Sequence, residues 1–438
     1  MRGQPDGARA YLFRYHESTG SGPARQVPVP FPFTEPTAAT GMQAGDLVLA
    51  VERVMPDGLA ARAGMQAGDL VLAVAGQPPT EEVLDRPLLA SGLELRVWSA
   101  GAMRNVTLRG DGAPGIEAMA TIYPLACSPS NLLGTLPACR VAVEPGSYLI
   151  LVRSDRHEDL RLPVHVQRAG ERLTLRADLH PAGMSPPGFV FVAAGEFTAG
   201  GGGTSRPEQN RWLDGYWIAR NELSTRDYLE FLQDSETGAE IERCRKNWKL
   251  LLVPRKRCQI PEIHRPLWTL RPDGKYEPDR ELHLPITAIS CADCEAYCRW
   301  LSARAKRQNE PWLFRLPTED EWEKAARGVD ARAFPWGAQF DPNLCWMTNP
   351  LPATRPRGEP LRPRPLGDES PFGVRDMAGG VLEWCLGDYL GTPMRPWRSG
   401  AWGNTDSAFS RPAARNGGFP WRVDEKDGFR LVAVRRER

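Results

Sequence analysis

The stretch RLPTEDEWEKAARG, residues 315–328, is the densest local signal in the chain. Thr318 and Glu321 have the spacing of a capping box, in which each side chain accepts a hydrogen bond from the backbone N–H of the other residue. Three apolar residues then recur at the spacing of one buried helical stripe, namely Trp322, Ala325 and Ala326. The sequence therefore predicts a helix that starts at Thr318 and turns one apolar side to the core.

Two more helices are predicted from the same kind of start signal. Ser224 stands three residues before Asp227, and Ser290 stands three residues before Asp293. Each serine can cap a helix while the aspartate caps in return. We therefore expect one helix over about residues 224–232 and another that begins at Ser290.

Further segments accompany these helices in a fixed order. They are GFVFVAAGEF at 188–197, LPITAISCADCEAYCRWLS at 284–302, PWG at 335–337, FGVRDMAGGVLEW at 372–384, RSGAW at 398–402, RPAAR at 411–415 and DGFRL at 427–431. In that order and at those distances, residues 186–438 resemble the formylglycine-generating enzyme family, also called the sulfatase-modifying-factor domain. The resemblance implies a variant of the C-type lectin fold.

Composition and charge exclude several classes of partner. A formal net charge of +1 gives no electrostatic argument for binding nucleic acid or an anionic membrane. The chain has no apolar run of about 18 residues that could span a bilayer, and residues 1–20 lack the apolar segment of a secretory leader. Nine cysteines, an odd number, are typical of reduced thiols. We therefore expect a cytoplasmic protein with no nucleic-acid and no membrane partner.

The N-terminal third predicts a strand, a link and a small domain. Residues 1–40 contain a strand at 9–16 followed by a Pro/Gly-rich link. The sequence GMQAGDLVLAV then occurs twice, at 41–51 and 64–74. Residues 41–116 resemble a PDZ domain of the bacterial type, which implies that an extended peptide could add to a sheet edge. The alternative is a structural spacer without a peptide partner.

Residues 117–185 alternate apolar and polar positions around a Pro-Gly turn, which predicts a small β-sandwich. This part resembles β domains found beside sulfatase-modifying-factor domains, including those attached to bacterial serine/threonine kinases. The predicted fold class is therefore α+β multidomain. It has a PDZ-like N-terminal domain, a small β-sandwich in the middle and a C-type-lectin-like domain over residues 186–438. Residues 235–283 are basic and without a clear period, so a long ordered loop is expected there.

Three cysteines lie on one face of the helix predicted from Ser290, namely Cys291, Cys294 and Cys298. Thiolates at such spacings can hold a metal if a fourth ligand comes from elsewhere. The resemblance places these positions toward the core, where a free cysteine behaves as a small apolar residue. Buried thiols are the favoured interpretation, and a metal site is the alternative.

The segment 399–415, SGAWGNTDSAFSRPAAR, contains no cysteine, and the last cysteine of the chain is Cys385. The resemblance implies that enzymes of the family bind copper there through a cysteine pair, and neither asparagine nor phenylalanine can replace a thiolate. The last histidine is His283, so two imidazoles for a non-haem iron cannot come from residues 284–438. No copper, no iron and no catalytic residue are therefore expected. The alternative is a formylglycine-generating or non-haem-iron oxidoreductase whose ligands lie elsewhere.

One metal remains implied by the resemblance, a structural calcium in the segment FGVRDMAGGVLEW. Its ligands would be the Asp376 side chain, the backbone carbonyls of Gly379 and Val381, and the Glu383 carboxylate. Oxygen ligands of this kind suit calcium. Gly380 departs from the asparagine that is usual in the family, and the alternative is a calcium-free turn with Glu383 in a salt bridge.

Two segments near the C-terminus, GNTDSAFS and NGGFPWRVDEK, mix aromatic and short polar residues without a helical or strand period. Adaptable recognition surfaces use this mixture. The candidate ligand-binding residues are Asn404, Thr405, Asp406, Phe409, Asn416, Phe419, Trp421, Arg422 and Asp424. The alternative is an ordinary exposed loop.

We therefore expect a non-catalytic protein that binds an unknown protein or small-molecule ligand at its C-terminal domain. The resemblance implies two settings for such a protein. One is the sensory or scaffolding part of a bacterial signalling protein, and the other is a variable protein diversified by a retroelement.

Overall fold

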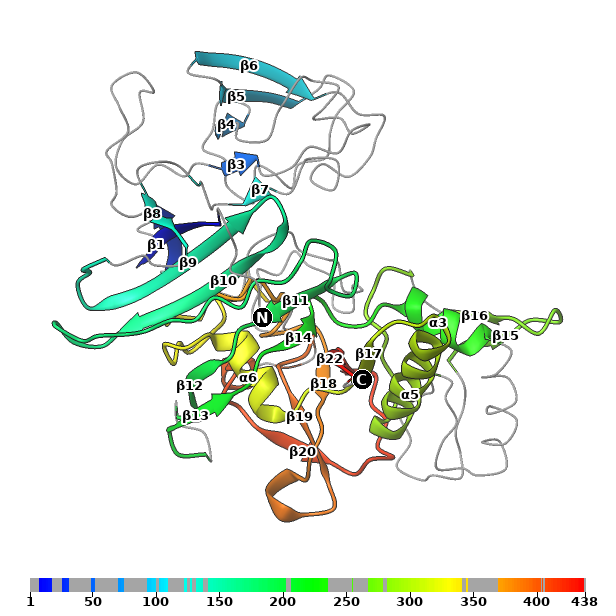
Figure 1. Cartoon of the computed structure of the whole chain (residues 1–438). Coiled ribbons are helices and arrows are strands. Elements are labelled where there is room, and N and C mark those ends of the chain that lie inside the picture. The colour runs from blue at the N-terminus through cyan, green and yellow to red at the C-terminus, as the bar shows by residue number, and fades with distance from the viewer. Residues whose placement is uncertain are drawn as a thin grey trace. The chain divides into compact units, whose positions relative to one another are not determined.

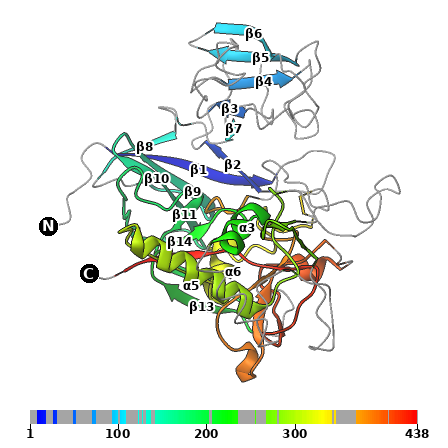
Figure 2. The same ribbon diagram turned by 90° about the vertical axis from the view of Figure 1, so that its right-hand side faces the viewer.

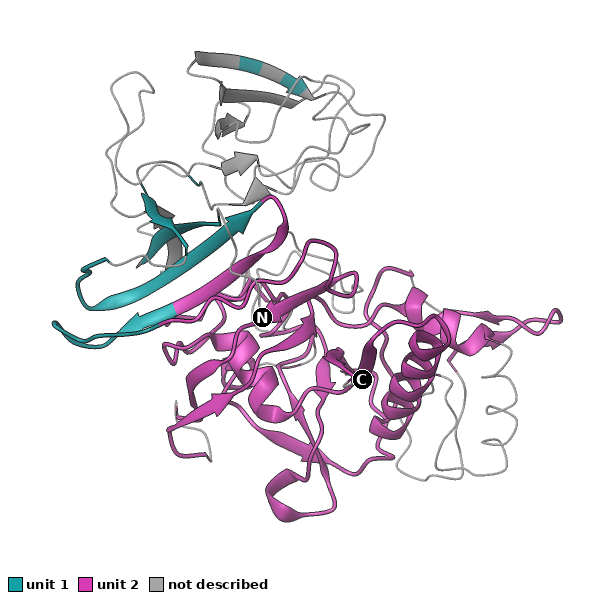
Figure 3. Cartoon of the chain, viewed as in Figure 1, with its two compact units in different colours: residues 1–154, 164–174, 365–367 teal, residues 155–163, 175–364, 368–438 magenta. Residues whose placement is uncertain are grey.

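The structure is a computed structural model, and Figure 1 shows it as a ribbon. It describes residues 8–17, 26–30, 49–51, 70–74, 93–99, 102–108, 122–123, 127, 131–136, 141–201, 206–234, 254, 267–278, 282–340, 344–345, 369–402, 404 and 406–436. The chain divides into two compact units (Figure 3). Unit 1 comprises residues 1–154, 164–174 and 365–367, and unit 2 comprises residues 155–163, 175–364 and 368–438.

One sheet contains strands from two separate parts of the sequence, residues 9–30 and residues 132–166. Its strands are β1 (Arg9–Glu17), β2 (Gln26–Pro30), β8 (Leu132–Thr135), β9 (Gly146–Ser154) and β10 (His157–Val166). The order is β10-β9-β1-β2, and β8 also pairs with β1. Phe13 of β1 lies opposite Leu149 of β9, and both side chains are buried in one apolar cluster. Within the described residues this is one sheet, whereas the sequence predicted a two-sheet sandwich.

A second sheet lies between β2 and β8 in the sequence. Its strands are β3 (Leu49–Val51), β4 (Leu70–Val74), β5 (Leu93–Ser99), β6 (Ala102–Leu108) and β7 (Ile122–Tyr123), in the order β6-β5-β4-β3-β7. The repeated sequence supplies two neighbouring strands, because Leu49 of the first copy pairs with Val71 of the second. The carboxylate loop and groove of a PDZ domain lie outside the described residues. The predicted boundaries 1–40, 41–116, 117–185 and 186–438 stay a prediction, to which the pairing of β1 with β9 adds a direct link between the first and third parts.

Unit 2 is mainly sheet with few helices. One sheet has the order β11 (Phe189–Val192), β14 (Tyr216–Ala219), β22 (Val432–Arg435) and β17 (Trp312–Arg315). Another has the order β20 (Asn416–Gly418), β19 (Arg395–Arg398), β18 (Leu382–Trp384) and β21 (Asp427–Gly428). Two hairpins complete the strands, β12 (Gly195–Ala199) with β13 (Gln209–Leu213) and β15 (Thr269–Leu270) with β16 (Tyr276–Glu277). The second hairpin lies where the sequence predicted a loop.

The helices of unit 2 start where the sequence predicted. They are α3 (Thr225–Gln233), α5 (Cys291–Arg307) and α6 (Glu319–Arg327), with short 3-10 turns η2 (Tyr389–Gly391) and η3 (Ser407–Ser410). Ser224, Ser290 and Thr318 are the cap residues, and each side-chain oxygen accepts from the backbone N–H three residues on. The capping boxes at Ser290 and Thr318 are closed in both directions. The three helix starts and the boxes at Ser290 and Thr318 are confirmed, whereas at Ser224 the carboxylate of Asp227 accepts from the serine hydroxyl at 2.7 Å.

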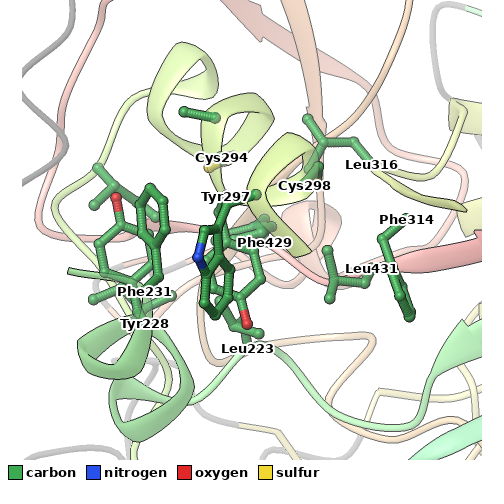
Figure 4. Close-up of a cluster of buried hydrophobic side chains, with 14 of the residues drawn as sticks. Leu223, Tyr228, Phe231, Cys294, Tyr297, Cys298, Phe314, Leu316, Phe429 and Leu431 are labelled. Carbon is green, nitrogen blue, oxygen red and sulfur yellow. The ribbon is translucent and has the colours of Figure 1, made fainter. Parts of the chain in front are cut away.

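An aromatic core lies between α3, α5 and the β11-β14-β22-β17 sheet (Figure 4). Figures 1 and 2 both show α3 beside α5. Between these helices the rings of Tyr228 and Tyr297 stack, with their centroids 5.7 Å apart. Trp322, Ala325 and Ala326 of α6 are fully buried in a neighbouring cluster, as their spacing predicted. Among the described residues, no helix combines the length and apolar character needed to cross a membrane.

Candidate functional site

A buried ion network connects α6 to the C-terminal segments. Glu323 is fully buried, and Oε1 accepts from Arg327 at 2.9 Å while Oε2 accepts from Arg398 at 3.2 Å. Arg398 also donates to the carbonyl of Pro412 at 2.8 Å. The network therefore holds β19 and the RPAAR segment on α6, which explains why these motifs occur together.

The fully buried carboxylate of Glu383, on β18, accepts three hydrogen bonds. Arg430 donates from Nε to Oε2 at 2.6 Å and from Nη2 to Oε1 at 2.8 Å, and Trp322 donates from Nε1 to Oε2 at 2.8 Å. The salt bridge that was the alternative to calcium is thus present in the structure. Both lone-pair positions of Oε2 are used, whereas Oε1 keeps one.

Glu222, which sequence reasoning missed, lies beside this ion pair. Its side chain is buried, and Oε1 has no hydrogen-bond partner in the part of the chain that the structure describes. Burial, followed by the negative charge of Asp376, raises the pKa of Glu222 well above its usual range. Gly380 makes room for it, since a Cβ at this position would stand 2.7 Å from Oε1. Only the folded chain brings Glu222 to this turn, so no local sequence signal marks it.

The oxygen donors around Asp376 fit calcium. The oxygen donors are the carboxylates of Asp376 and Glu222 and the backbone carbonyls of Gly379 and Val381. Calcium prefers hard oxygen ligands of this kind. The carbonyl of Gly379 accepts from Ser399 Oγ at 3.1 Å and has a second lone pair to offer, and Val381 is fully buried. Within the described ranges no three acidic, histidine or cysteine side chains form a metal-holding group, so backbone carbonyls would have to complete the shell.

In the segment after β19, polar side chains form hydrogen bonds with the backbone of the segment's own turns. Asn404 Oδ1 accepts from the backbone N–H of Ala401 at 2.7 Å. Asp406 caps the η3 turn by accepting from the N–H of Ala408 at 2.8 Å. Phe409, within η3, exposes 37% of its surface. Thr405 lies outside the described residues.

The most exposed aromatic surface among the predicted ligand residues is the aromatic pair, Phe419 and Trp421. Their ring centroids are 4.9 Å apart and the ring planes differ by 10°. The two side chains expose 47% and 44% of their surface. The two adjacent rings form an exposed apolar surface, and covering it with a partner would be favourable because burial of apolar area lowers the free energy.

The loop that carries the aromatic pair is held at two points. The carbonyl of Pro420 accepts from the N–H of Ala292 in the first turn of α5 at 3.3 Å. Arg422 Nη1 donates to both carboxylate oxygens of Asp427 at 2.9 Å, and Nη2 donates to Asp424 at 3.3 Å. Its guanidinium also lies 4.3 Å from the centroid of the Trp397 ring. Arg422 and Asp424 therefore position the loop.

Burial affects the protonation of Asp427, the carboxyl that accepts hydrogen bonds from Arg422. Asp427 is almost fully buried, and this burial raises its pKa to about 8, although the positive charge of Arg422 acts in the opposite direction. The carboxyl therefore ionises much less readily than an exposed aspartate.

The strand β20 ends this surface, and Asn416 is its first residue. Gly417 packs on the Tyr389 ring, where an added Cβ would stand 2.3 Å from Cγ, and Gly418 packs on the Trp397 ring, where it would stand 2.2 Å from Cζ3. Glycine is required at both positions because the rings occupy the space of any side chain. The predicted residues 416–424 are thus brought together with η2 and α5.

Four described cysteines of unit 2 are buried free thiols, namely Cys291, Cys294, Cys298 and Cys385. Burial raises the pKa of Cys294 and of Cys385 well above the usual range, and it also raises that of Cys291 and Cys298. The predicted core location of the three cysteines on α5 is confirmed. Protonated thiols of this kind are poor metal ligands and poor nucleophiles.

Two protein families match the sequence. Residues 176–435 match the sulfatase-modifying factor enzyme 1-like domain, and residues 51–92 match a PDZ domain. The inactive C-alpha-formylglycine-generating enzyme 2 of Mus musculus is 28% identical over 293 residues, which are 60% of this chain and 89% of that protein. The formylglycine-generating enzyme of Thermomonospora curvata is 27% identical over 256 residues, 51% of this chain and 76% of the enzyme. Hercynine oxygenase of Mycobacterium tuberculosis is 30% identical over 179 residues, 34% of this chain and 36% of the enzyme.

Solved structures with a related chain path include PvdO from Pseudomonas aeruginosa and Treponema denticola variable protein 1. PvdO is 20% identical with a TM-score of 0.39, and the match covers 56% of this chain and 93% of PvdO. The variable protein is 17% identical with a TM-score of 0.36, and the match covers 56% of this chain and 94% of that protein.

Proposed function

Because the chain belongs to the sulfatase-modifying factor enzyme 1-like family, which residues 176–435 match, we propose that its C-terminal domain binds a ligand and does not oxidise one. The binding surface is the aromatic pair. The single observation that carries this proposal is an exposed pair of stacked, nearly parallel rings on a loop that is fixed to α5 and to Asp427. A ligand that covers these rings gains apolar contact without first ordering the loop.

The enzyme alternative rests on relatives, two of which are named as a formylglycine-generating enzyme and a hercynine oxygenase. Against it stands the sequence, which has no cysteine after Cys385 and no histidine after His283. A third relative is named as inactive. These observations favour binding over oxidation for this chain.

Binding and oxidation can be separated with the full-length protein. We expect no copper or iron in stoichiometric amount after purification without added metal, and no oxygen uptake with a cysteine-containing peptide. In a screen against peptide, glycan and metabolite collections, a ligand should lose about tenfold or more in affinity when Trp421→Ala removes a central aromatic contact. Leu313→Ala, on the exposed face of β17, is the matched control. Stoichiometric copper or iron with oxygen uptake would overturn the proposal.

Calcium is part of the same proposal. Asp376, the carbonyls of Gly379 and Val381, and Glu383 would hold it, with Glu222 as a further carboxylate. At a free concentration about 100 times its dissociation constant, a bound ion stabilises the fold by about 2.7 kcal/mol, so Tm should be higher in calcium than in a chelator. Glu222→Gln should remove this difference, whereas Glu208→Gln, an exposed control, should keep it. An equal Tm in calcium and chelator would refute the calcium site.

Three wider expectations stay predictions. They are a peptide partner for the PDZ-like domain, a cytoplasmic location, and a sensory or scaffolding role in a signalling or retroelement-diversified protein.

A further inference from the structure

We propose that the outer edge of β13 binds an extended, basic segment of another protein, which adds a strand to the β12–β13 hairpin. This surface is separate from the aromatic pair. Figure 1 shows the hairpin beside α6, and β13 pairs with β12 alone among the described strands. The sheet therefore ends at β13 within the part of the chain that the structure describes.

Backbone geometry makes this edge a template for another strand. The two strands are in register over five residue pairs, from Gly195 opposite Leu213 to Ala199 opposite Gln209. In an antiparallel pair, alternate residues turn their N–H and C=O groups away from the partner strand. Four of the five β13 residues are exposed and the fifth is half-buried. An extended chain can therefore reach these outward backbone groups.

The hairpin also exposes a large aromatic side chain. Trp212 is 63% exposed, more than any other large hydrophobic side chain among the described residues. It lies opposite Glu196 in the register, so the two side chains share one face. Trp212 Nε1 is 3.4 Å from Asp214 Oδ1, which places a second acid near the indole. The ring face is thus a ready contact for the partner strand.

The charges around the edge favour a basic partner. Glu196, Glu208 and Asp214 are exposed. Arg211 is the basic residue of β13, and its Nη1 lies 2.6 Å from Oδ2 of Asp320 on α6, a carboxylate that it shares with Arg206. A lysine or arginine of the added strand would meet these acids and could lie over the Trp212 ring as a cation–π partner. A second copy of this edge would instead bring like charges together.

The test uses a fluorescein-labelled, end-capped peptide of alternating lysine and valine, titrated by anisotropy with the full chain at low salt. We expect saturable binding that weakens as salt screens the charges. Trp212→Ala should weaken it by about fivefold, and Glu196→Gln by roughly threefold. The Trp421→Ala variant should bind this peptide as the parent does, which separates this edge from the proposed ligand surface.

Backbone pairing is tested with methylated probes, because an added strand turns only alternate amides toward β13. Methylation of one alternate set should abolish binding, and methylation of the other set should leave it unchanged. Hydrogen exchange of residues 206–214 should slow when peptide is bound.

Three results would overturn the assignment. They are the absence of binding, equal affinity of the two methylated probes, and undiminished binding by Trp212→Ala. Because the Trp212 side chain is exposed, we expect this variant to fold as the parent does. A dimer in sedimentation that Trp212→Asp dissolves would instead assign the edge to a second copy.

Discussion

The guanidinium of Arg398 has no contact with water and spans two carboxylates of α6. It lies 3.2 Å from Glu323 and 3.3 Å from Glu319. We expect Arg398→Met to cost about 3 kcal/mol in free energy of unfolding, because Glu323 then keeps a buried charge with one fewer partner. Arg395→Met, which removes a half-exposed ion pair, should cost no more than about 1 kcal/mol. Urea unfolding measures both, and equal losses would contradict the assignment of the network as buried.

Burial of Lys324 lowers the pKa of its amine and makes the stability of the fold depend on pH. Its Nζ donates to the carbonyls of Ala193 at 2.7 Å and Gly195 at 3.0 Å, and burial lowers its pKa from 10.5 to about 8. Between these values the unfolded chain binds a proton that the folded chain does not, so stability should rise with pH from about 8 toward 10. The difference in unfolding free energy between the parent and Lys324→Met should change across this window. A constant difference between about pH 7 and about pH 9, each about a unit from the folded value, would show that Lys324 keeps its ordinary pKa.

At the scale of elements, β20 is fitted to the rings beside it. Gly417→Ala would place a Cβ 2.3 Å from the Tyr389 ring. We expect a loss of about 1–3 kcal/mol, the usual range for overpacking. The double variant with Tyr389→Ala should recover most of it relative to Tyr389→Ala alone, since the obstacle is then gone. Additive losses in this cycle would place the strain elsewhere.

Element starts could be predicted from the sequence because a cap and its partner are three residues apart. Ser290 with Asp293 and Thr318 with Glu321 needed no knowledge of the rest of the chain. The short β15–β16 hairpin was missed because strands of two residues leave no period to detect. Glu222 was missed for a different reason: the negative charge of Asp376 acts on it, and only tertiary folding brings these two positions near each other.

At the scale of the whole molecule, strand pairing groups residues that the sequence separated. β7 pairs with β3 although it lies beyond the predicted boundary at 116, and β1 pairs with β9. We therefore expect that excision of residues 41–123, with a short glycine-serine bridge, leaves the β10-β9-β1-β2 sheet intact. Excision of 1–40 should instead disrupt that sheet, because it removes β1. Circular dichroism and limited proteolysis of the two deletions compare these outcomes, and equal proteolytic resistance would contradict the pairing.

The pairing of β1 with β9 also has a consequence for synthesis on the ribosome. β1 (Arg9–Glu17) leaves the exit tunnel before its neighbour β9 (Gly146–Ser154), which emerges only after the intervening chain has been translated. At ordinary elongation rates this interval is on the order of ten seconds. During it the edge of β1 that pairs with β9 in the native sheet is without that strand, so a nascent-chain chaperone has an opportunity to bind there.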